Sequence, residues 1–537
     1  MDVMNGKKKM IKNTCIISVL PHHREIKVKT GTVLMEALMA KNIFLRSDCG
    51  GRGVCEKCRV KLKKNQEDYD IINACQLKIT TDVCIKIPDS SLMSSHIITK
   101  APIIFERRFK KGAGSIAAKQ EYGLAVDLGT TTIAVYLCDI GQREVVSSLA
   151  VKNPQALFGD DVMSRISAIV RDKKNLSIQQ NLVVNAIQWG VNELIAPSRL
   201  NPASLFWMSV VGNPAMIHIF LGVDPSSIGV YPFQPAFFNA RQIAGEHLGF
   251  KNLNVMIQTL PQVSGFIGAD ILSAALAVDF KAQPAASLLM DLGTNGELLL
   301  NTKDKIFATS CATGPAFEGA SLSCGMQALP GAVDRIEMIG PQKKCTYSVI
   351  KKKKAGQTKP SGICGTGVIS AIARFYENEV IDSDGRLIMN AGIPAIIKDK
   401  SGQTMYVIVP KESPVSSSIG ISQKDIRSVQ LGKAALMTGI EFLMKEAEIR
   451  ELNRIIIAGA FGSHIKAQDM MTLGMIPRMP EKKISLRGNA AGAGAVMALC
   501  DKTYISGIRH VTETLCQVDL ASQPDFQKTF VKNLNFP

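Results

Sequence analysis

The stretch GLAVDLGTTTIAVYLCDI, residues 123–140, decides how this chain is interpreted. Its pattern predicts a buried strand at 124–126, a sharp turn, and a second strand at 133–137. A segment of the same design, SLLMDLGTNGELLL, occupies residues 287–300. A duplicated nucleotide-binding fold needs two phosphate-binding hairpins that face each other across a cleft. The repetition therefore predicts an α/β protein with such a cleft.

The residue types in the first hairpin suit phosphate and Mg²⁺. Gly129 lets the backbone approach a bulky anion, and the amides and hydroxyls of Thr130 and Thr131 can donate to phosphate oxygens. Asp127 can hold Mg²⁺ through water. Taken alone, this segment also fits a tight β-hairpin whose aspartate caps the turn. The repetition around Asp291 favours the nucleotide site.

Length and composition indicate a globular protein of several domains. The chain has 537 residues, of which 46% are hydrophobic and 20% charged, and this length exceeds one ordinary core. No apolar run reaches the ~18 residues of a membrane helix, and the run behind the basic N-terminus is too short for a signal peptide. We therefore expect a cytoplasmic protein without a membrane partner. Thirteen cysteines in such a chain favour metal ligands or core thiols over disulfides.

The formal net charge of +17 raises the possibility of a nucleic-acid partner. The basic residues lie in short scattered runs, however, and no aromatic residues are interleaved with them. We therefore expect solvated loops and no nucleic-acid partner. Electrostatic steering of acidic protein partners is a second possibility.

The N-terminal segment predicts a small domain. Strands at 14–19 and 24–28 precede a helix at 32–42, whose apolar residues have helical spacing. This β–β–α opening is common to β-grasp domains. Cys84 lies on a further expected strand and is interpreted as a core thiol.

Four cysteines in this segment form a C-x5-C-x2-C-x16-C pattern: Cys49, Cys55, Cys58 and Cys75. The glycines among them free the backbone to wrap round a cluster and to direct amides at its sulfurs. Four thiolates, three of them in one loop, satisfy a 2Fe–2S centre. Zinc is the alternative, but structural zinc sites usually use two CxxC pairs and this pattern contains one. The segment resembles plant-type and adrenodoxin-like ferredoxins, with one extra residue between the first two ligands relative to the plant spacing.

The rest of the chain divides into a linker and a large domain. We assign residues 12–90 to the first domain and residues 91–120 to a flexible linker, because the latter contain a proline, a basic run and Gly-Ala-Gly. Residues 121–537 contain both hairpins, a glycine-rich turn into a helix at 361–373 (SGICGTGVISAIA) and an apolar strand running into glycines at 454–465 (RIIIAGAFGSHI). We also expect a long helix at residues 430–447, with its apolar residues mostly on one side.

Two DLGT hairpins, a glycine-rich crossing helix and a strand–GAFG element, in that order, resemble the actin-like (ASKHA) superfamily of acetate and sugar kinases, chaperone ATPases and actin. With the N-terminal domain added, the chain resembles the reductive activators of corrinoid proteins, found with anaerobic methyltransferase systems. The resemblance covers about residues 12–90 and 121–500, including FGDDVMSRI, VVGNPAM, DLGTNGEL, ATGPAFEG and IAGAFGSHI. It implies a β-grasp 2Fe–2S ferredoxin domain plus a duplicated, ribonuclease H-like ATPase domain.

The resemblance also implies a function. One electron restores Co(I) from inactive Co(II) in a corrinoid protein, and ATP bound between the lobes drives this unfavourable step. A reductase or ferredoxin supplies the electron, and the family favours a homodimer. By matching positions, Cys49, Cys55, Cys58 and Cys75 hold the cluster. The residues around the phosphates and Mg²⁺ are Asp127, Gly129, Thr130, Thr131, Asp291, Gly293, Thr294 and Asn295. Gly459 and Gly462 face the nucleoside.

Asp270 leaves alternatives open. In LPQVSGFIGADILSAAL it is expected in the first turn of a helix, where aspartate is most often a cap or a first-turn charge. It also matches the position of the catalytic base in sugar kinases of this fold. A small-molecule kinase is therefore one alternative function. An ATP-driven electron donor to a dehydratase-type enzyme and a redox-sensing module are two others.

Overall fold

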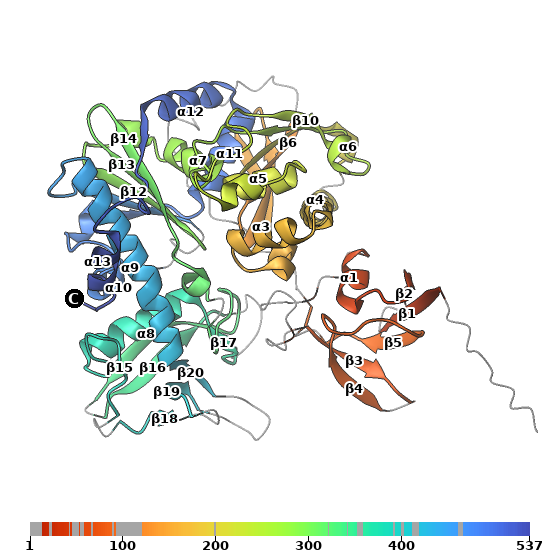
Figure 1. Cartoon of the computed structure of the whole chain (residues 1–537), viewed down its shortest axis with the longest axis horizontal. Coiled ribbons are helices and arrows are strands. Elements are labelled where there is room, and N and C mark those ends of the chain that lie inside the picture. The colour runs from red at the N-terminus through yellow and green to blue at the C-terminus, as the bar shows by residue number, and fades with distance from the viewer. Residues whose placement is uncertain are drawn as a thin grey trace, which may run out of the picture.

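The computed structural model describes residues 13–20, 24–41, 43, 45, 53, 58–65, 68–88, 91–92, 121–197, 200–319, 322–340, 342–351, 358–389, 393–398, 402–410, 418–459 and 465–537. Figure 1 shows a large α/β body and a smaller domain at the N-terminal end of the chain. Among the described residues, none of the helices has the length and apolarity that crossing a bilayer requires.

The N-terminal domain is a five-stranded sheet with strand order β2-β1-β5-β3-β4. Its strands are β1 (Thr14–Leu20), β2 (Arg24–Lys29), β3 (Arg59–Lys63), β4 (Tyr69–Asn73) and β5 (Val83–Lys86). The helix α1 (Leu34–Met39) buries Leu34 and Leu38 in the core of this domain. It is shorter than the predicted helix at 32–42 because Val33 is extended and pairs with Lys78 in a β-bridge. The predicted β–β–α opening is confirmed.

The first hairpin lies in the middle of a six-stranded sheet with order β10-β11-β9-β6-β7-β8. The strands are β6 (Tyr122–Leu128), β7 (Thr132–Asp139), β8 (Glu144–Lys152), β9 (Leu205–Gly212), β10 (Gln242–Ala244) and β11 (Met256–Thr259). Helices of this lobe are α3 (Val162–Arg171), α4 (Lys174–Ile195), α5 (Pro214–Phe220), α6 (Gly245–Leu248) and α7 (Ala269–Ala277). The short 3-10 helix η1 (Pro154–Phe158) follows β8.

The second hairpin has the same place in a second six-stranded sheet, with order β22-β21-β12-β13-β14-β23. The strands are β12 (Ser287–Leu292), β13 (Gly296–Asn301), β14 (Ile306–Cys311), β21 (Arg454–Ala458), β22 (Ile484–Leu486) and β23 (Leu515–Gln517). In each sheet an antiparallel three-stranded meander is followed by two strands parallel to its first strand. The predicted duplication is therefore confirmed.

Two helices, α7 and α11 (Ala490–Cys500), pack between the sheets, as Figure 1 shows. Their apolar core takes residues from both sheets, for example Ala125 and Leu289. Small residues are required here because a Cβ added to Gly494 would lie 2.2 Å from the Ser273 carbonyl oxygen. This close approach explains the small residues of α11, and the shared core joins the two lobes.

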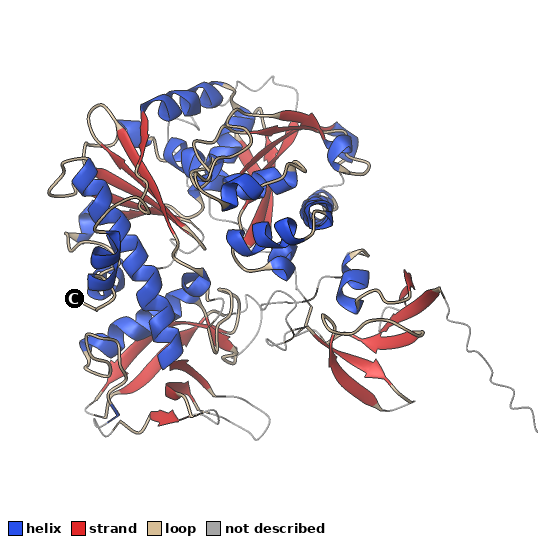
Figure 2. Cartoon of the chain, viewed as in Figure 1, coloured by secondary structure: helices blue, strands red, loops and turns tan. Residues whose placement is uncertain are grey.

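The remaining elements extend the second lobe, as the helix and strand colours of Figure 2 show. Two three-stranded sheets have orders β16-β15-β17 and β18-β19-β20. Their strands are β15 (Ala332–Ile339), β16 (Lys344–Val349), β17 (Gly362–Ile363), β18 (Ile396–Lys398), β19 (Thr404–Val409) and β20 (Ile419–Ser422). The helices of this extension are α8 (Gly365–Glu377), α9 (Gln423–Glu446), α10 (Ala467–Leu473) and α13 (Phe526–Lys532). The helix α12 (Thr503–Thr514) packs instead against α7 and α11 in the core between the lobes.

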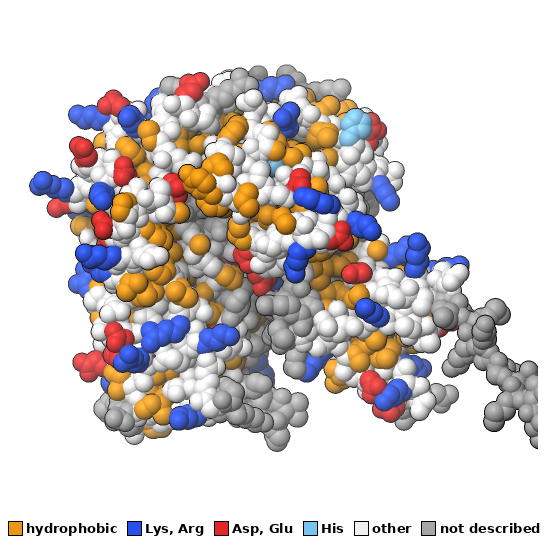
Figure 3. Space-filling model, viewed as in Figure 1, with side chains coloured by type: hydrophobic (Ala, Val, Ile, Leu, Met, Phe, Trp, Pro, Cys, Tyr) orange, Lys and Arg blue, Asp and Glu red, His pale blue; other side chains and the backbone are white. Residues whose placement is uncertain are grey.

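The N-terminal domain is in direct contact with the large body. Leu182 of α4 is buried in the same apolar cluster as the core of the small domain, and Leu157 and Phe158 of η1 pack against that cluster. The predicted linker lies outside the described residues apart from residues 91–92. Lys and Arg side chains are scattered among acidic ones on the visible face (Figure 3).

Candidate functional site

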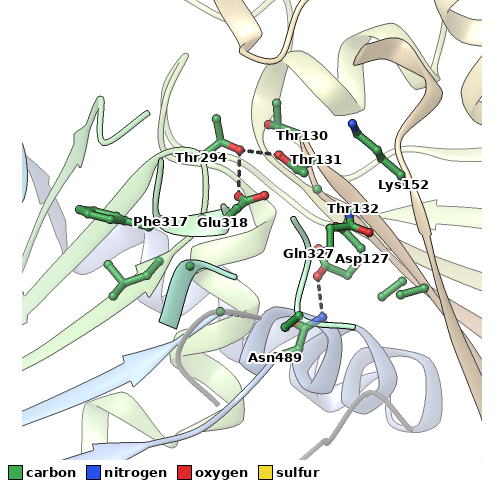
Figure 4. Close-up of a pocket in the computed structure, with 18 of the residues that line it drawn as sticks. Asp127, Thr130, Thr131, Thr132, Lys152, Thr294, Phe317, Glu318, Gln327 and Asn489 are labelled. Carbon is green, nitrogen blue, oxygen red and sulfur yellow. Dashed lines mark hydrogen bonds between the residues drawn. The ribbon is translucent and has the colours of Figure 1, made fainter. Parts of the chain in front are cut away.

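The turns of the two hairpins meet at the centre of the large body. The Oγ1 atoms of Thr131 and Thr294 are 2.7 Å apart and hydrogen-bonded to each other (Figure 4). Thr131 is the second residue after the Asp-Leu-Gly of its hairpin, and Thr294 is the first residue after that of the other hairpin. The prediction that the hairpins face each other is therefore confirmed.

A cavity of about 700 Å³ opens between the hairpins, a size typical of small-molecule sites. The residues predicted from the sequence that line it are Asp127, Gly129, Thr130, Thr131, Asp270, Asp291, Gly293, Thr294, Asn295 and Gly459. Gly462 lies outside the described residues. The structure thus brings the described members of the predicted nucleotide site together, and their individual roles stay predictions.

Two of these glycines are required by the backbone itself. A Cβ on Gly129 would lie 2.6 Å from the Thr132 carbonyl oxygen, which accepts the Gly129 N–H at 3.0 Å. Gly459 has a φ of +94°, and a Cβ there would lie 2.8 Å from Asp291 Oδ1. Each glycine therefore permits close packing within or against a hairpin, in addition to the room it leaves for a ligand.

Buried carboxyl groups gather at the cavity. Burial, which disfavours the charged form, raises the pKa of Asp127 to about 6 and the pKa of Asp270 to about 7. The pKa of Asp291 is raised to about 8, first by burial and then by the charges of Asp270 and Asp127. Glu297 of β13 also has a raised pKa from burial and from the neighbouring aspartates. Burial and mutual repulsion thus disfavour the charged forms of these carboxyl groups, a setting in which a bound cation is favourable.

The carboxyl cluster fits a bound divalent cation better than it fits a bare anion. Lys152 and Lys351 also line the cavity, but two ammonium groups are few against these acids and a triphosphate. Among the described residues, no three Asp, Glu, His or Cys side chains converge closely enough to hold a metal alone. Mg²⁺ commonly keeps several waters and binds through one or two carboxylates plus phosphate oxygens, and the site is compatible with that mode.

Asn489 fixes the first aspartate. Its Nδ2 donates to Asp127 Oδ2 at 2.7 Å and to Tyr136 Oη at 3.0 Å. Its Oδ1 accepts the Gly492 N–H at 2.8 Å as the N-cap of α11. Asn489 is not among the predicted site residues, although an asparagine before a helix of small residues is a capping signal.

Glu318 connects the hairpins from the second lobe. It ends the short helix η5 (Pro315–Glu318), and its Oε1 accepts a hydrogen bond from Thr294 Oγ1 at 2.9 Å (Figure 4). Burial raises its pKa, against the opposing effect of hydrogen bonds from Thr131 and Thr294. Glu318 is not among the predicted site residues, although it is the only charged residue in CATGPAFEGASLSCGM, whose small residues suggest tight packing beside a ligand.

Behind the first turn, two further side chains were also missed. Asn213, the N-cap of α5, donates from Nδ2 to Thr130 Oγ1 at 2.9 Å. Arg165 of α3 is fully buried and donates to the Thr130 carbonyl at 2.6 Å. The sequence of an amphipathic helix does not indicate which of its arginines will be buried, so Arg165 could not be predicted from the sequence pattern alone.

The described part of the predicted cluster site comprises Cys58 and Cys75. Cys58 is 1% exposed, and its carbonyl accepts the Ala74 N–H at 3.1 Å, which brings the two cysteine segments together. The Gln76 side-chain amide donates to Cys75 Sγ at 3.6 Å, the kind of N–H···S contact that an iron–sulfur site uses. These features fit a thiolate-bound cluster. Cys49 and Cys55 lie outside the described residues.

Comparison with known families agrees with this architecture. Residues 122–283 match the family described as "RACo middle region", and residues 285–537 match "C-terminal domain of RACo the ASKHA domain". Residues 17–80 match the "2Fe-2S iron-sulfur cluster binding domain" family. The predicted ferredoxin-type and ASKHA folds are both confirmed, and the cluster type implied by the N-terminal family is 2Fe–2S and not zinc.

Individual relatives span most of the chain. The chain is 27% identical to the corrinoid activation enzyme RamQ of Eubacterium limosum, over 95% of this chain and 97% of the relative. It is 25% identical to a Methanosarcina barkeri protein named as the Co(II) methylated amine-specific corrinoid protein reductase, over 77% of each chain. A solved structure of a reductive activator for corrinoid, iron–sulfur protein superposes with a TM-score of 0.72 at 24% identity, covering 97% of this chain and 98% of that one. That superposition supports the fold.

Proposed function

Because this chain belongs to the RACo family, the reductive activators of corrinoid proteins, we propose that it uses ATP to reduce Co(II) to Co(I) in the corrinoid protein of a methyltransferase system. The observation that carries the proposal is the joining, in one chain, of a ferredoxin-type domain to a cleft with two facing phosphate hairpins. The names of its relatives, which include a Co(II) corrinoid protein reductase, agree with this reaction.

In the nucleotide cleft, the backbone and hydroxyl groups of the two turns would bind the phosphates. These residues are Gly129, Thr130, Thr131, Gly293, Thr294 and Asn295. Asp127 and Asp291 would hold Mg²⁺, which when bound neutralises and orients the triphosphate. Asp270 would accept the proton of the attacking water, because a pKa of about 7 suits proton transfer near neutral pH. Gly459 and Gly462 would face the nucleoside.

In the ferredoxin-type domain, residues 12–90 by our proposed division, the cluster ligands would be Cys49, Cys55, Cys58 and Cys75. A bound 2Fe–2S cluster takes up and releases one electron at a time. We propose that a reductase or a ferredoxin supplies the electron and that residues 91–120 connect this domain to the ATPase domain at 121–537. We propose a homodimer as the working form.

The energetic role of ATP follows from linkage. For a one-electron couple, each ~59 mV corresponds to a tenfold change in an equilibrium constant. In our scheme the ATP-bound chain binds the Co(I) state of its partner more tightly than the Co(II) state, and this differential affinity raises the effective potential. Hydrolysis then resets the affinity so that the partner dissociates. ATP changes the shape of the chain, and no substrate is phosphorylated.

The test is anaerobic mixing of the reduced chain, MgATP and a Co(II) corrinoid protein, with the Co(I) absorption band as the readout. We expect the band only when all three are present. Screening the same mixture for a phosphorylated small molecule tests the kinase alternative. A Co(I) band that is absent from the complete mixture, while the cluster is intact and reduced, would contradict the proposal.

A further inference from the structure

The carbonyl oxygens of the first phosphate turn are all held from one side. Asn153 Nδ2 donates to the Gly129 carbonyl at 3.0 Å, and the Asn153 N–H donates to the Thr131 carbonyl at 2.8 Å. Arg165 Nη2 donates to the Thr130 carbonyl at 2.6 Å. In a trans peptide the N–H points opposite to the preceding C=O. These bonds therefore direct the following N–H groups of the turn away from Asn153 and Arg165, as phosphate binding requires.

Arg165 is committed to this support. Its Nε donates to the Gly159 carbonyl and its Nη1 to Gln155 Oε1, each at 3.1 Å. Burial lowers the pKa of Arg165 to about 10, so the guanidinium is still charged at neutral pH. A buried charge is tolerated only when its donors are satisfied. The Thr130 carbonyl accepts one of the hydrogen bonds of the Arg165 guanidinium. A displacement of the turn would therefore break or strain that hydrogen bond.

The same residues begin a short helix. Asn153 is the N-cap of η1, and its Oδ1 accepts the Gln155 N–H at 3.0 Å. Gln155 Nε2 donates to the Gln179 carbonyl of α4 at 3.2 Å, and Gln179 Nε2 donates back to the Arg165 carbonyl at 3.1 Å. The phosphate turn, η1, α3 and α4 thus share one buried polar network.

The opposite end of η1 contacts the ferredoxin-type domain. Leu157 and Phe158, its last two residues, pack against the apolar cluster of that domain, and Leu182 of α4 is buried in it. Figure 1 shows the domain below α3 and α4. The short helix η1 therefore contacts the first phosphate turn at its N-terminal end and the ferredoxin-type domain at its C-terminal end.

We propose that η1 couples nucleotide binding to the docking of the ferredoxin-type domain, with Asn153 and Arg165 as positioning residues. This inference rests on the proposed function, since it takes ATP at the first hairpin as given. Phosphate that moves the turn displaces its three carbonyls. Because an unsatisfied donor in a buried network is costly, Asn153 and Arg165 follow the turn and shift η1. By reciprocity, weakening the docking changes the affinity for nucleotide.

The test is a double-mutant cycle on the Kd of the full-length, cluster-loaded chain for the non-hydrolysable analogue Mg-AMPPNP, measured by titration calorimetry. Phe158→Ala removes an apolar contact with the ferredoxin-type domain, and Phe158 does not line the cavity. We expect this change to shift the Kd about fivefold or more. In an Arg165→Lys background the same change should leave the Kd unaltered, because lysine cannot bridge the acceptors that the guanidinium holds.

Controls come from the same helices. Arg171→Lys at the exposed end of α3 and Ile178→Ala at a residue of α4 that is 44% exposed should leave the Kd unchanged. Leu182→Ala replaces Phe158→Ala if the latter fails to fold. Asn153→Ser, which keeps a capping hydroxyl but shortens the donor to Gly129, replaces Arg165→Lys in the same event. Thermal unfolding identifies folded variants.

Each outcome decides the inference. A Kd unchanged by both Phe158→Ala and Leu182→Ala would overturn it, as would an equal shift in the unaltered and Arg165→Lys backgrounds. If the unaltered chain bound no nucleotide, the proposed function and this inference would fail together. If it bound nucleotide without any coupling to Phe158, only the inference would fail.

Discussion

The two phosphate hairpins share a sequence pattern and a place in their sheets, but they are supported differently. Arg165 and Asn153 hold the first turn through buried and partly charged hydrogen bonds. The hydroxyl of Thr313 holds the second turn, donating to the carbonyls of Gly293 and Thr294 at 3.2 and 3.0 Å. The two turns are alike in lining the cavity, and they differ in the side chains that hold their carbonyl groups from behind.

The difference follows the neighbours of each lobe. Behind the first turn lie η1 and α4, which pack against the ferredoxin-type domain. Behind the second turn lies α9, where a Cβ added to Gly432 would be 2.6 Å from the Thr313 carbonyl oxygen. A neutral hydroxyl suffices where the turn meets a tightly packed helix of its own lobe. The hydrogen bonds of the buried Arg165 guanidinium connect the first turn to η1, which packs against a second domain.

The largest expected effect comes from the feature that the hairpins share. Asp127→Ala and Asp291→Ala should each lower ATP turnover by about 100-fold or more, because each removes a carboxylate proposed to hold Mg²⁺. The 2Fe–2S absorption spectrum should be intact in both variants. Asp304→Ala, in the exposed turn between β13 and β14, is the matched control. Normal turnover in Asp127→Ala would show that the first hairpin is wrongly assigned.

The second prediction separates the electron carrier from the cleft. Cys58→Ala should abolish the 2Fe–2S spectrum, because a cluster with three thiolates is incomplete, and should leave turnover of ATP measurable. Cys84→Ala on β5 should keep the spectrum. Visible spectroscopy of the purified variants is the measurement. An unchanged spectrum in Cys58→Ala would remove that residue from the ligand set.

The third prediction concerns the two supports. Arg165→Lys should weaken MgATP binding about tenfold, since hydrogen bonds to a charged group are worth about 1.5–3 kcal/mol, while Thr313→Val should weaken it only about threefold. The measurement is the Kd of each variant. Equal losses of MgATP affinity in the two variants would mean that the two kinds of support contribute equally to nucleotide binding.

The smallest expected effect is on stability against pH. The raised pKa values of Asp127, Asp270 and Asp291, about 6, 7 and 8, lie above the unfolded value of ~4. The folded chain therefore binds protons more tightly, so the stability that these groups contribute is fully present below about pH 4 and is lost progressively as the pH rises from about 4 to about 8. We expect the Tm of the metal-free, nucleotide-free chain to fall over this range.

Asp291→Asn should make this fall shallower, and MgATP should offset it because its Mg²⁺ would place positive charge beside the carboxylates. Thermal unfolding followed by circular dichroism at several pH values checks both points. A Tm that rises between about pH 6 and about pH 8 in the unaltered chain, with the same slope in Asp291→Asn, would contradict this account of the carboxyl groups.

Local pattern was enough to predict the elements that carry the chemistry. Both hairpins and the opening strands were predicted because alternation of apolar residues and a glycine turn are local properties. The long helix predicted near Gln430 begins earlier, at Gln423, because Ser422 and Asp425 form a capping box. The Ser-x-x-Asp pattern is a local signal for the first turn of a helix. The apolar periodicity becomes clear only later in the helix, so a prediction from periodicity alone starts the helix too late.

The supporting side chains could not be predicted in the same way. Asn489 contacts Asp127 from a segment 362 residues away in the chain, so this contact depends on how the two lobes come together. Arg165 and Glu318 contact Thr130 and Thr294 within their own lobes, but they do so from separate helices. A capping asparagine or a lone buried charge has many ordinary explanations in a sequence. The fold decides which of them applies, since hydrogen bonds across the cleft exist only once both sheets are in place.

The most direct test of the central claim is a redox equilibrium. A Co(II) corrinoid protein is poised anaerobically at a fixed potential at which little Co(I) forms, and the unaltered chain and then MgATP are added. We predict that the Co(I) absorption rises on addition of MgATP and that the Asp127→Ala chain gives no rise. A Co(I) level that is the same with and without MgATP would contradict the claim that ATP drives the electron uphill.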